Sequence, residues 1–312
     1  MPTPPIVALV GATASGKTGL SLDLAEALGG EIVNTDAMQV YAGMDIGTAK
    51  VPLAERRGIT HHLLDLLTVR EPLTVARFQE QARDLATELR RHGTTPVLVG
   101  GSALYTRAIL DRFDFPATDP DVRARWEGEL AAVGSLALHA RLALTDPAAA
   151  AKIERENGRR VVRALEVIEI TGAPYASSLP ELTYADPRTI QVGLEIDRPT
   201  LDRRIEQRVA EMFEAGFVAE VERLLTEGLA EGVTAARAIG YREVRAHLAG
   251  DLSLEETRER TVIATRQFSR RQDAWFKKDP RIVWVRFDAP DRAQQALAAI
   301  TATATTSAGG DR

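Results

Sequence analysis

The segment Gly11–Thr18 reads Gly-Ala-Thr-Ala-Ser-Gly-Lys-Thr, which matches the phosphate-binding pattern G-x-x-x-x-G-K-[ST] at every fixed position. The run before it, Ile6–Val10, is apolar and rich in β-branched residues, which is typical of a buried parallel strand. Leucines and alanines at helical spacing follow as far as Leu28, and two glycines then end the helix. Strand, glycine-rich loop and helix therefore come in the order that a phosphate-binding loop requires, whereas an ordinary strand-turn-helix would match only by chance.

Such a loop binds a di- or triphosphate through several groups at once. Its glycines let backbone N–H groups point inward, and the helix N-terminus adds partial positive charge. The ammonium group of Lys17 can reach the terminal phosphates, and the hydroxyl of Thr18 can ligate Mg²⁺. The loop alone does not say which phosphate compound binds.

The composition is that of a globular protein, with 45% hydrophobic and 27% charged residues in 312. The absence of cysteine excludes disulfides and cysteine-ligated zinc, and it fits a reducing compartment. No apolar run approaches membrane-spanning length and no signal-peptide pattern is present, so we expect a cytoplasmic protein that does not bind membranes. The net charge of −5 restricts any nucleic-acid binding to local basic patches.

Short apolar runs alternate with amphipathic stretches in the first third of the chain. Strands are predicted over 31–36, 61–67 and 96–101, and an amphipathic helix over Val75–Arg91. This alternation predicts an α/β fold, in which a parallel sheet carries helices on both faces.

Residues 119–172 have almost only helix signals, and strand signals then return over 191–197 and 282–288. The late strand favours one α/β core, formed by residues 1–115 and 190–312, with a helical insertion at 116–189, over two consecutive domains. The last residues, 301–312, are rich in Ala, Thr, Ser and Gly and are expected to be frayed. Further helices of the core are predicted over 200–215, 218–227, 242–249 and 254–276.

Asp36 ends the second predicted strand, and ligands of open α/β sheets bind at the carboxyl ends of strands. Its carboxylate can hold Mg²⁺ through water or accept a proton. Alternatively, it caps the N-terminus of the next segment. The pattern by itself leaves these possibilities open.

Taken together, these motifs resemble those of the tRNA dimethylallyltransferase family, which forms isopentenyladenosine. The resemblance extends from about residue 10 to residue 276 in the family's order, and the run Met44–Lys50 is more specific than a phosphate loop alone. The segments that carry it are 11–18, 34–50, 61–63, 99–105, 119–123, 157–167, 238–243 and 265–272.

The resemblance implies a P-loop NTPase-like enzyme. Members of this family use Mg²⁺ and transfer a five-carbon prenyl group from dimethylallyl diphosphate to N6 of the adenosine at tRNA position 37, just 3′ of the anticodon. The family's general base falls on Asp36. An exocyclic adenine amine is a poor nucleophile, because its lone pair is delocalised into the ring, and a carboxylate that removes a proton as the C–N bond forms would help.

The resemblance also implies how the diphosphate leaving group is held. Negative charge develops on the departing oxygens, and loop N–H groups, Lys17 and Mg²⁺ on Thr18 can stabilise it. A hydroxyl at Ser102 and a guanidinium at Arg208 are the family's further groups near the diphosphate, although Arg208 could instead form a surface salt bridge with Glu206 or Glu211. The implied diphosphate-binding residues are Gly11, Ala12, Thr13, Ala14, Ser15, Gly16, Lys17 and Thr18.

Two positions depart from the family pattern. Ser102 stands where the family typically has threonine, which keeps the hydroxyl but loses the methyl group that restricts its rotamer. Ala37 stands where the family usually has serine, so any hydrogen bond from that hydroxyl to tRNA is lost while a backbone contact remains possible.

Two basic stretches, 152–163 and 260–278, are candidates for tRNA contacts, the second with Trp275 and Phe276 available for base stacking. Each on its own would also fit a solvated helix face. Chemistry on a base requires that the base leave its stack for a pocket. The implied tRNA-binding residues are Asp36, Ala37, Met38, Gln39, Arg123, Arg159, Arg160, Val161, Val162, Arg163, Arg237, Tyr241, Arg270 and Arg271.

His61 and His62 are not expected to form a metal site, because adjacent strand residues point to opposite faces. The expected partners are therefore dimethylallyl diphosphate, Mg²⁺ and the anticodon stem-loop of tRNA, acted on by a monomer. The main alternative is a P-loop kinase for a nucleoside or small molecule. A GTPase-like switch protein is a weaker alternative, because the guanine-specificity motif Asn-Lys-x-Asp is absent.

Overall fold

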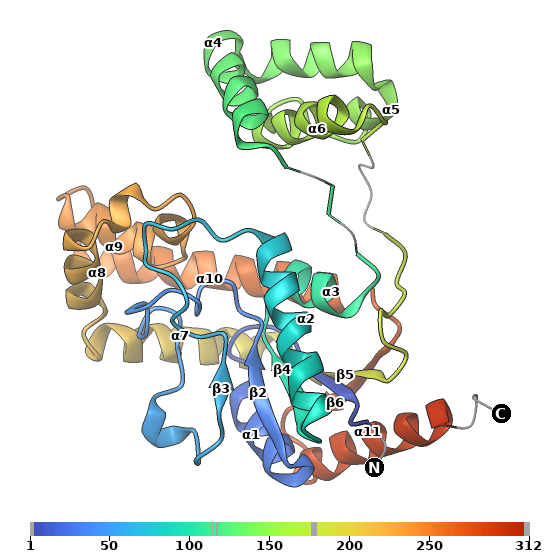
Figure 1. Cartoon of the computed structure of the whole chain (residues 1–312). Coiled ribbons are helices and arrows are strands. Elements are labelled where there is room, and N and C mark those ends of the chain that lie inside the picture. Colours follow the sequence, from blue (N-terminus) through green and yellow to red (C-terminus); the bar gives the residue numbers. More distant parts are fainter. Residues whose placement is uncertain (1–2, 114, 117, 176–179, 309–312) are drawn as a thin grey trace. The chain divides into compact units, whose positions relative to one another are not determined.

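The computed structural model describes residues 3–113, 115–116, 118–175 and 180–308. Contacts divide the chain into two compact units (Figure 1). The sheet unit comprises residues 1–111 and 184–312, and the helical unit comprises residues 112–183. No helix within the described ranges is both long and apolar enough to cross a membrane.

The sheet unit contains six parallel strands in the order β3-β2-β4-β1-β5-β6, which confirms the predicted α/β class. The predicted strand over 61–67 is much shorter than expected, because Leu63 and Asp65 adopt positive φ angles of 59° and 55° that extended backbone does not allow. The strands are β1 (Ile6–Val10), β2 (Gly30–Asn34), β3 (His61–His62), β4 (Thr95–Val99), β5 (Thr189–Glu195) and β6 (Ile282–Arg286).

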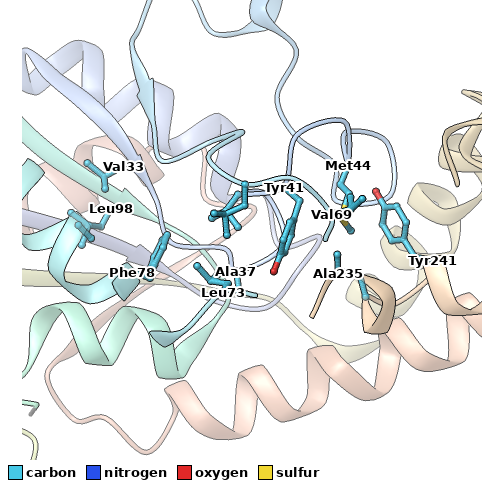
Figure 2. Close-up of a cluster of buried hydrophobic side chains, with 14 of the residues drawn as sticks. Val33, Ala37, Tyr41, Met44, Val69, Leu73, Phe78, Leu98, Ala235 and Tyr241 are labelled. Carbon is cyan, nitrogen blue, oxygen red and sulfur yellow. The ribbon is translucent and has the colours of Figure 1, made fainter. Parts of the chain in front are cut away.

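Alternate residues of the strands enter two hydrophobic layers, as the period of a strand requires. On one face, Val7 and Leu9 of β1 pack with α1 (Lys17–Leu28) and α11 (Arg292–Ala308). On the other face, Ala8 and Val10 belong to the larger cluster, which includes α2 (Val75–Arg91). Figure 2 shows part of this cluster, from Val33 and Leu98 on the sheet to Tyr41, Met44 and Tyr241.

Most of the remaining helices of the sheet unit form one run of the chain between β5 and β6 (Figure 1). Helix α11 continues through residue 308, because its many alanines favour helix, and residues 309–312 of the tail lie outside the described residues. The expected fraying of the tail stays a prediction. The remaining helices are α3 (Ala103–Leu110), α7 (Arg198–Glu214), α8 (Phe217–Thr226), α9 (Tyr241–Leu248), α10 (Leu254–Phe276) and the 3₁₀ turns η1 (Leu53–Glu55), η2 (Leu229–Glu231) and η3 (Ala235–Arg237).

The helical unit has its own core. Its helices are α4 (Pro120–Thr145), which is kinked at Gly134, α5 (Pro147–Ala150) and α6 (Gly158–Thr171). Trp126 and Leu142 pack against Val161 and other residues of α6. This core consists of residues of the helical unit alone.

Glu166 is the polar centre of the helical unit. Its fully buried carboxylate accepts hydrogen bonds from Arg123 (2.7 Å), Arg163 (2.8 Å), the hydroxyl of Thr118 (2.7 Å) and the N–H of Asp119 (3.2 Å). Burial alone would raise the pKa of Glu166, but the arginine and threonine donors outweigh it and lower that pKa to about 2. Glu166 therefore stays ionised and keeps Arg123 and Arg163 in place.

Candidate functional site

The candidate residues lie at the carboxyl ends of four neighbouring strands of the sheet, or in the segments that follow them. β2 ends just before Asp36, β4 just before Ser102, and β1 just before the phosphate loop. After β5 comes α7, which carries Arg208. Because β2, β4, β1 and β5 are neighbours in a parallel sheet, their carboxyl ends bring these residues together.

The phosphate loop adopts the conformation that its sequence predicts. Gly16 has a φ of +102° at the N-cap of α1, a backbone conformation that favours glycine, and Ala14 has a φ of 62°. The ammonium of Lys17 donates to the carbonyl oxygens of Gly11 (3.0 Å) and Ala12 (2.7 Å), so it lies back over the loop. The start of α1 and the ammonium together form a concentrated positive site.

Arg208 adds a second cation to this loop. Its Nη1 donates to the hydroxyl of Thr13 (3.3 Å), and it forms no ion pair with a carboxylate in the described part of the chain. The alternative partners are engaged elsewhere, since Glu206 pairs with Arg266 and Glu211 accepts from Gln207. The alternative, a surface salt bridge from Arg208 to Glu206 or Glu211, is therefore not formed. The guanidinium of Arg208 remains available to an anion.

The electrostatics of the loop favour an anionic ligand. Burial, followed by the charge of Arg208, lowers the pKa of Lys17 to about 7, while the carboxylate of Asp36 works in the opposite direction. Burial, followed by the charge of Arg204, likewise lowers the pKa of Arg208. Burial makes the charged forms of Lys17 and Arg208 unfavourable, and neither cation forms an ion pair in the described part of the chain. This indicates a site whose ligand supplies the negative charge.

Asp36 lies in a tight turn at the end of β2. Its Oδ1 accepts from the N–H of Met38 (2.8 Å), and its own N–H donates to Oδ1 of Asn34 (2.8 Å). The carboxylate therefore caps the segment that follows it, as one of the alternatives had it, although no helix begins there. Burial raises its pKa, although the N–H of Met38 and the charge of Lys17 oppose the shift. A carboxylate with a raised pKa is a stronger base than an exposed aspartate.

Ser102 positions the residue next to Asp36. Its Oγ accepts from the N–H of Ala37 at 3.2 Å, which joins the end of β4 to the turn after β2. The hydroxyl of Ser102 therefore binds the backbone of Ala37. Ala37 is also the position at which this sequence lacks the serine usual in the family.

Two cavities meet at these residues, both within the sheet unit. The first, of about 100 Å³, is polar and is lined by Lys17 and Thr18. The second, of about 320 Å³, is largely apolar and is lined by Met212, Phe217 and Phe268 among others. The residues that line both are Thr13, Asp36, Thr48, Ala49 and Arg208.

Gln272 of α10 is a site residue that the sequence interpretation did not single out. Its Oε1 accepts from the N–H of Thr13 (2.8 Å), and its Nε2 donates to the carbonyl oxygen of Gly101 (2.9 Å). It thereby ties the phosphate loop to the glycine pair before Ser102. Its place in the motif 265–272 was the only hint, because a lone glutamine has no distinctive spacing.

Besides the turn after β2, the sheet unit contains five residues that were predicted to bind RNA, and they differ in exposure. Arg237, Arg270 and Arg271 are exposed. Gln39 donates to the carbonyl oxygen of Thr48 (3.1 Å), whereas Tyr241 is buried. Tyr241 nevertheless lines the apolar cavity beside Asp36, so its contact with the RNA substrate stays a prediction.

In the helical unit, Arg159 and Arg160 at the start of α6 are exposed. The side chains of Val161 and Val162 are buried in the core of that unit, so their predicted contact with tRNA stays a prediction that concerns their backbone. A stretch with helical periodicity must place some residues inward, and the motif as a whole could not show which.

The polar cavity can hold Mg²⁺ if a bound phosphate compound supplies part of its coordination shell. Within the described ranges, no three His, Cys, Asp or Glu side chains are grouped so as to hold a metal ion. The hydroxyl of Thr18 and the carboxylate of Asp36 both line the polar cavity. Mg²⁺ in phosphate sites takes one or two protein oxygens and completes its shell with phosphate and water, so these residues suffice. His61 and His62 bond separately, to the carbonyl oxygen of Ile59 and to Glu31.

Diphosphate binding is expected to weaken as the pH rises above about 7, because Lys17 loses its proton there when no ligand is bound. An anion favours the charged ammonium, so binding above that pH takes up a proton, and the affinity falls by up to about tenfold per pH unit. Calorimetric titration with inorganic diphosphate between about pH 6 and pH 9 measures this. Lys17→Met is the control, because its diphosphate affinity changes with pH only through the titration of the ligand and of other groups. If the affinity of the wild type changed with pH in parallel with that of Lys17→Met, the expectation would be contradicted.

Comparisons with known proteins give a consistent picture. The family model described as IPP transferase matches residues 39–279. A tRNA dimethylallyltransferase of Nocardioides sp. is 70% identical over 305 residues, covering 97% of this chain and 98% of the relative. That of Kineococcus radiotolerans is 55% identical over 296 residues, covering 93% and 92%.

Solved structures of similar proteins agree. A eukaryotic dimethylallyltransferase acting on tRNA matches with a TM-score of 0.82 at 26% identity, covering 97% of this chain and 80% of the other. A tRNA isopentenylpyrophosphate transferase from Bacillus halodurans matches with a TM-score of 0.72 at 36% identity, covering 98% of both chains.

Proposed function

The chain belongs to the IPP transferase family, and on that premise we propose that it transfers the dimethylallyl group of dimethylallyl diphosphate to N6 of the adenosine at tRNA position 37. The products are N6-isopentenyladenosine and diphosphate. One observation carries the proposal: Asp36 and Arg208 line both a polar, cationic cavity and an apolar one. A base and a cation at that junction fit a reaction in which an amine meets a carbon that bears a diphosphate.

Asp36 acts as the general base. As the C–N bond forms, N6 of the adenine loses a proton, and the carboxylate of Asp36 accepts it. Ser102 supports this role by holding the N–H of Ala37, which fixes the turn that contains Asp36. Burial, which raises the pKa of Asp36, makes it a better proton acceptor near neutral pH.

The phosphate loop stabilises the leaving group. The C–O bond of the allylic diphosphate breaks as the new bond forms, and both electrons leave with the diphosphate oxygen. Lys17 and Arg208 both contact the phosphate loop, at the start of α1, which supports the proposal that they and the N–H groups there stabilise that charge. Mg²⁺, held by Thr18 with diphosphate oxygens, would supply further charge neutralisation.

The tRNA substrate requires contacts beyond the adenosine. The exposed Arg270 and Arg271 on α10 suit phosphates, and Arg237 lies at the rim of the apolar cavity. In the helical unit, Arg159 and Arg160 at the start of α6 are further candidates. We propose that these residues bind the anticodon stem-loop and that the protein acts as a monomer in the cytoplasm, where tRNA is modified.

The test is one incubation of the protein with dimethylallyl diphosphate labelled in its prenyl group, Mg²⁺ and unmodified tRNA. A parallel reaction contains ATP labelled in its terminal phosphate and small acceptors. We expect label in RNA only from the prenyl donor, at the adenosine 3′ of the anticodon. Phosphate transfer from ATP without prenylation of RNA would instead support the kinase interpretation.

A further inference from the structure

Glu220 of α8 is a buried carboxylate, only 7% exposed, that binds a run of backbone N–H groups. Its Oε2 accepts from the N–H groups of Asp45 (3.0 Å) and Ile46 (2.7 Å), and its Oε1 accepts from the N–H of Gly47 (3.1 Å). Three consecutive N–H groups thus converge on one side chain from a distant part of the sequence. Since the rest of this segment is irregular, Glu220 supplies acceptors that a helix or sheet would otherwise provide.

Tyr241 completes this cluster. Its hydroxyl donates to Oε1 of Glu220 at 2.6 Å, and burial followed by the charge of Glu220 raises its pKa, so it remains a donor. Its ring packs closely on the segment, because a Cβ at Gly47 would lie 2.5 Å from Tyr241 and 2.3 Å from Phe217. Figure 2 shows Tyr241 beside Met44, the residue before the segment. Only glycine fits at position 47.

The other end of the segment is fastened separately. The ammonium of Lys50 donates to Asp45 (2.6 Å), Asp65 (2.6 Å) and the carbonyl oxygen of Tyr41 (3.1 Å). Between the two fastenings, Ala49 has a φ of +52°, a conformation that is unfavourable for a residue other than glycine. Such a conformation persists only where surrounding contacts impose it. We call residues 45–50 the wall loop.

The wall loop borders both cavities of the site. Thr48 and Ala49 line the polar and the apolar cavity alike, as Asp36 does. Gln39, three residues after Asp36, donates to the carbonyl oxygen of Thr48. Glu220 itself lines neither cavity, so it acts on the site through the groups that it holds: the wall loop, and Tyr241, which lines the apolar cavity.

We propose that Glu220 is a positioning residue for prenyl transfer, which fixes the wall loop so that the acceptor base lies correctly against Asp36. The inference rests on the proposed function for its kinetic consequence, whereas its structural part concerns the loop alone. It also assigns Tyr241 to this cluster, where it supports Glu220.

Glu220→Gln tests the proposal, because an amide nitrogen cannot accept a hydrogen bond and must face at least one of the N–H groups. We expect faster hydrogen exchange of the peptides that contain residues 45–50. We also expect kcat/KM for tRNA to fall about tenfold or more, since a charged hydrogen bond to the loop is lost. The affinity for dimethylallyl diphosphate should stay within about twofold, because Glu220 does not touch the phosphate loop. Tyr241→Phe, which removes one donor, should give smaller changes of the same kind.

Glu222→Gln is the matched control, since Glu222 lies exposed on the same helix. It should exchange and react like the wild type. Unchanged exchange of the wall loop in Glu220→Gln would overturn the proposal. So would an equal loss of diphosphate affinity and tRNA activity, which would indicate a general folding role. If the wild type transfers no prenyl group, the proposed function fails, but hydrogen exchange still decides whether Glu220 holds the loop.

Discussion

Asp36→Asn is expected to slow prenyl transfer by about 10²- to 10⁴-fold, the usual contribution of a positioned general base. The amide keeps the size of the carboxyl group, and its oxygen can still accept from the N–H of Met38, so the turn should survive. What is lost is a group that can accept the proton of N6. Single-turnover rates with labelled donor and saturating tRNA measure the effect without product release.

The pH profile gives a second readout for Asp36. Only the ionised carboxylate accepts a proton, so the wild-type rate should fall as the pH drops through the pKa of Asp36. Burial raises that pKa, so the fall should begin above the range of an exposed aspartate. Asp36→Asn should lack it. Asp84→Asn, on the exposed face of α2, is the control and should behave like the wild type. A rate for Asp36→Asn close to that of the wild type would refute the assignment of the base.

Arg208→Gln is expected to lower kcat by about 10²- to 10³-fold, as the loss of one preorganised donor to a developing anion does elsewhere. Arg208 is a cation without a carboxylate partner in the described part of the chain, so its removal leaves no buried anion unpaired. The folded protein should therefore keep its unfolding temperature. The loss should lie mainly in kcat, since the charge that Arg208 stabilises grows as the C–O bond breaks.

Two variants complete the test of Arg208. Arg208→Lys retains the charge but not the planar donors and should recover part of the rate. Arg91→Ala removes an exposed arginine at the far end of α2 and should have no effect. An Arg208→Gln enzyme with normal kcat, or one that is much less stable than the wild type, would contradict a role at the leaving group.

The sequence was most informative where a local pattern has a single structural solution. The phosphate loop and the buried strands follow from glycine spacing and apolar runs, and the parallel sheet follows from their alternation. The length of β3 was overestimated, because residues other than glycine seldom adopt the positive φ angles of Leu63 and Asp65 that end the strand, and no sequence pattern announces them. The C-terminal helix was missed, because a low-complexity tail resembles a frayed one.

The site was less predictable where side chains from distant segments meet. Asp36 and Arg208 were identified through family resemblance, yet that resemblance did not show that both line two cavities. Gln272 and Glu220 were not singled out at all, because each acts on backbone groups far away in the sequence. Motifs also include residues whose side chains lie in the core, as the burial of Val161 illustrates.

The position of β1 in the sheet has a consequence for how the enzyme is made. β1 is synthesised before the other five strands of this sheet, but it lies in the interior of the sheet, between β4 and β5. Its partner β5 is synthesised only after the whole helical unit, since Ile6 pairs with Thr189. Gln272, which holds the phosphate loop, follows later still. A nascent chain therefore carries β1 with one open strand edge until β5 has been synthesised, an interval in which association with other chains competes with folding.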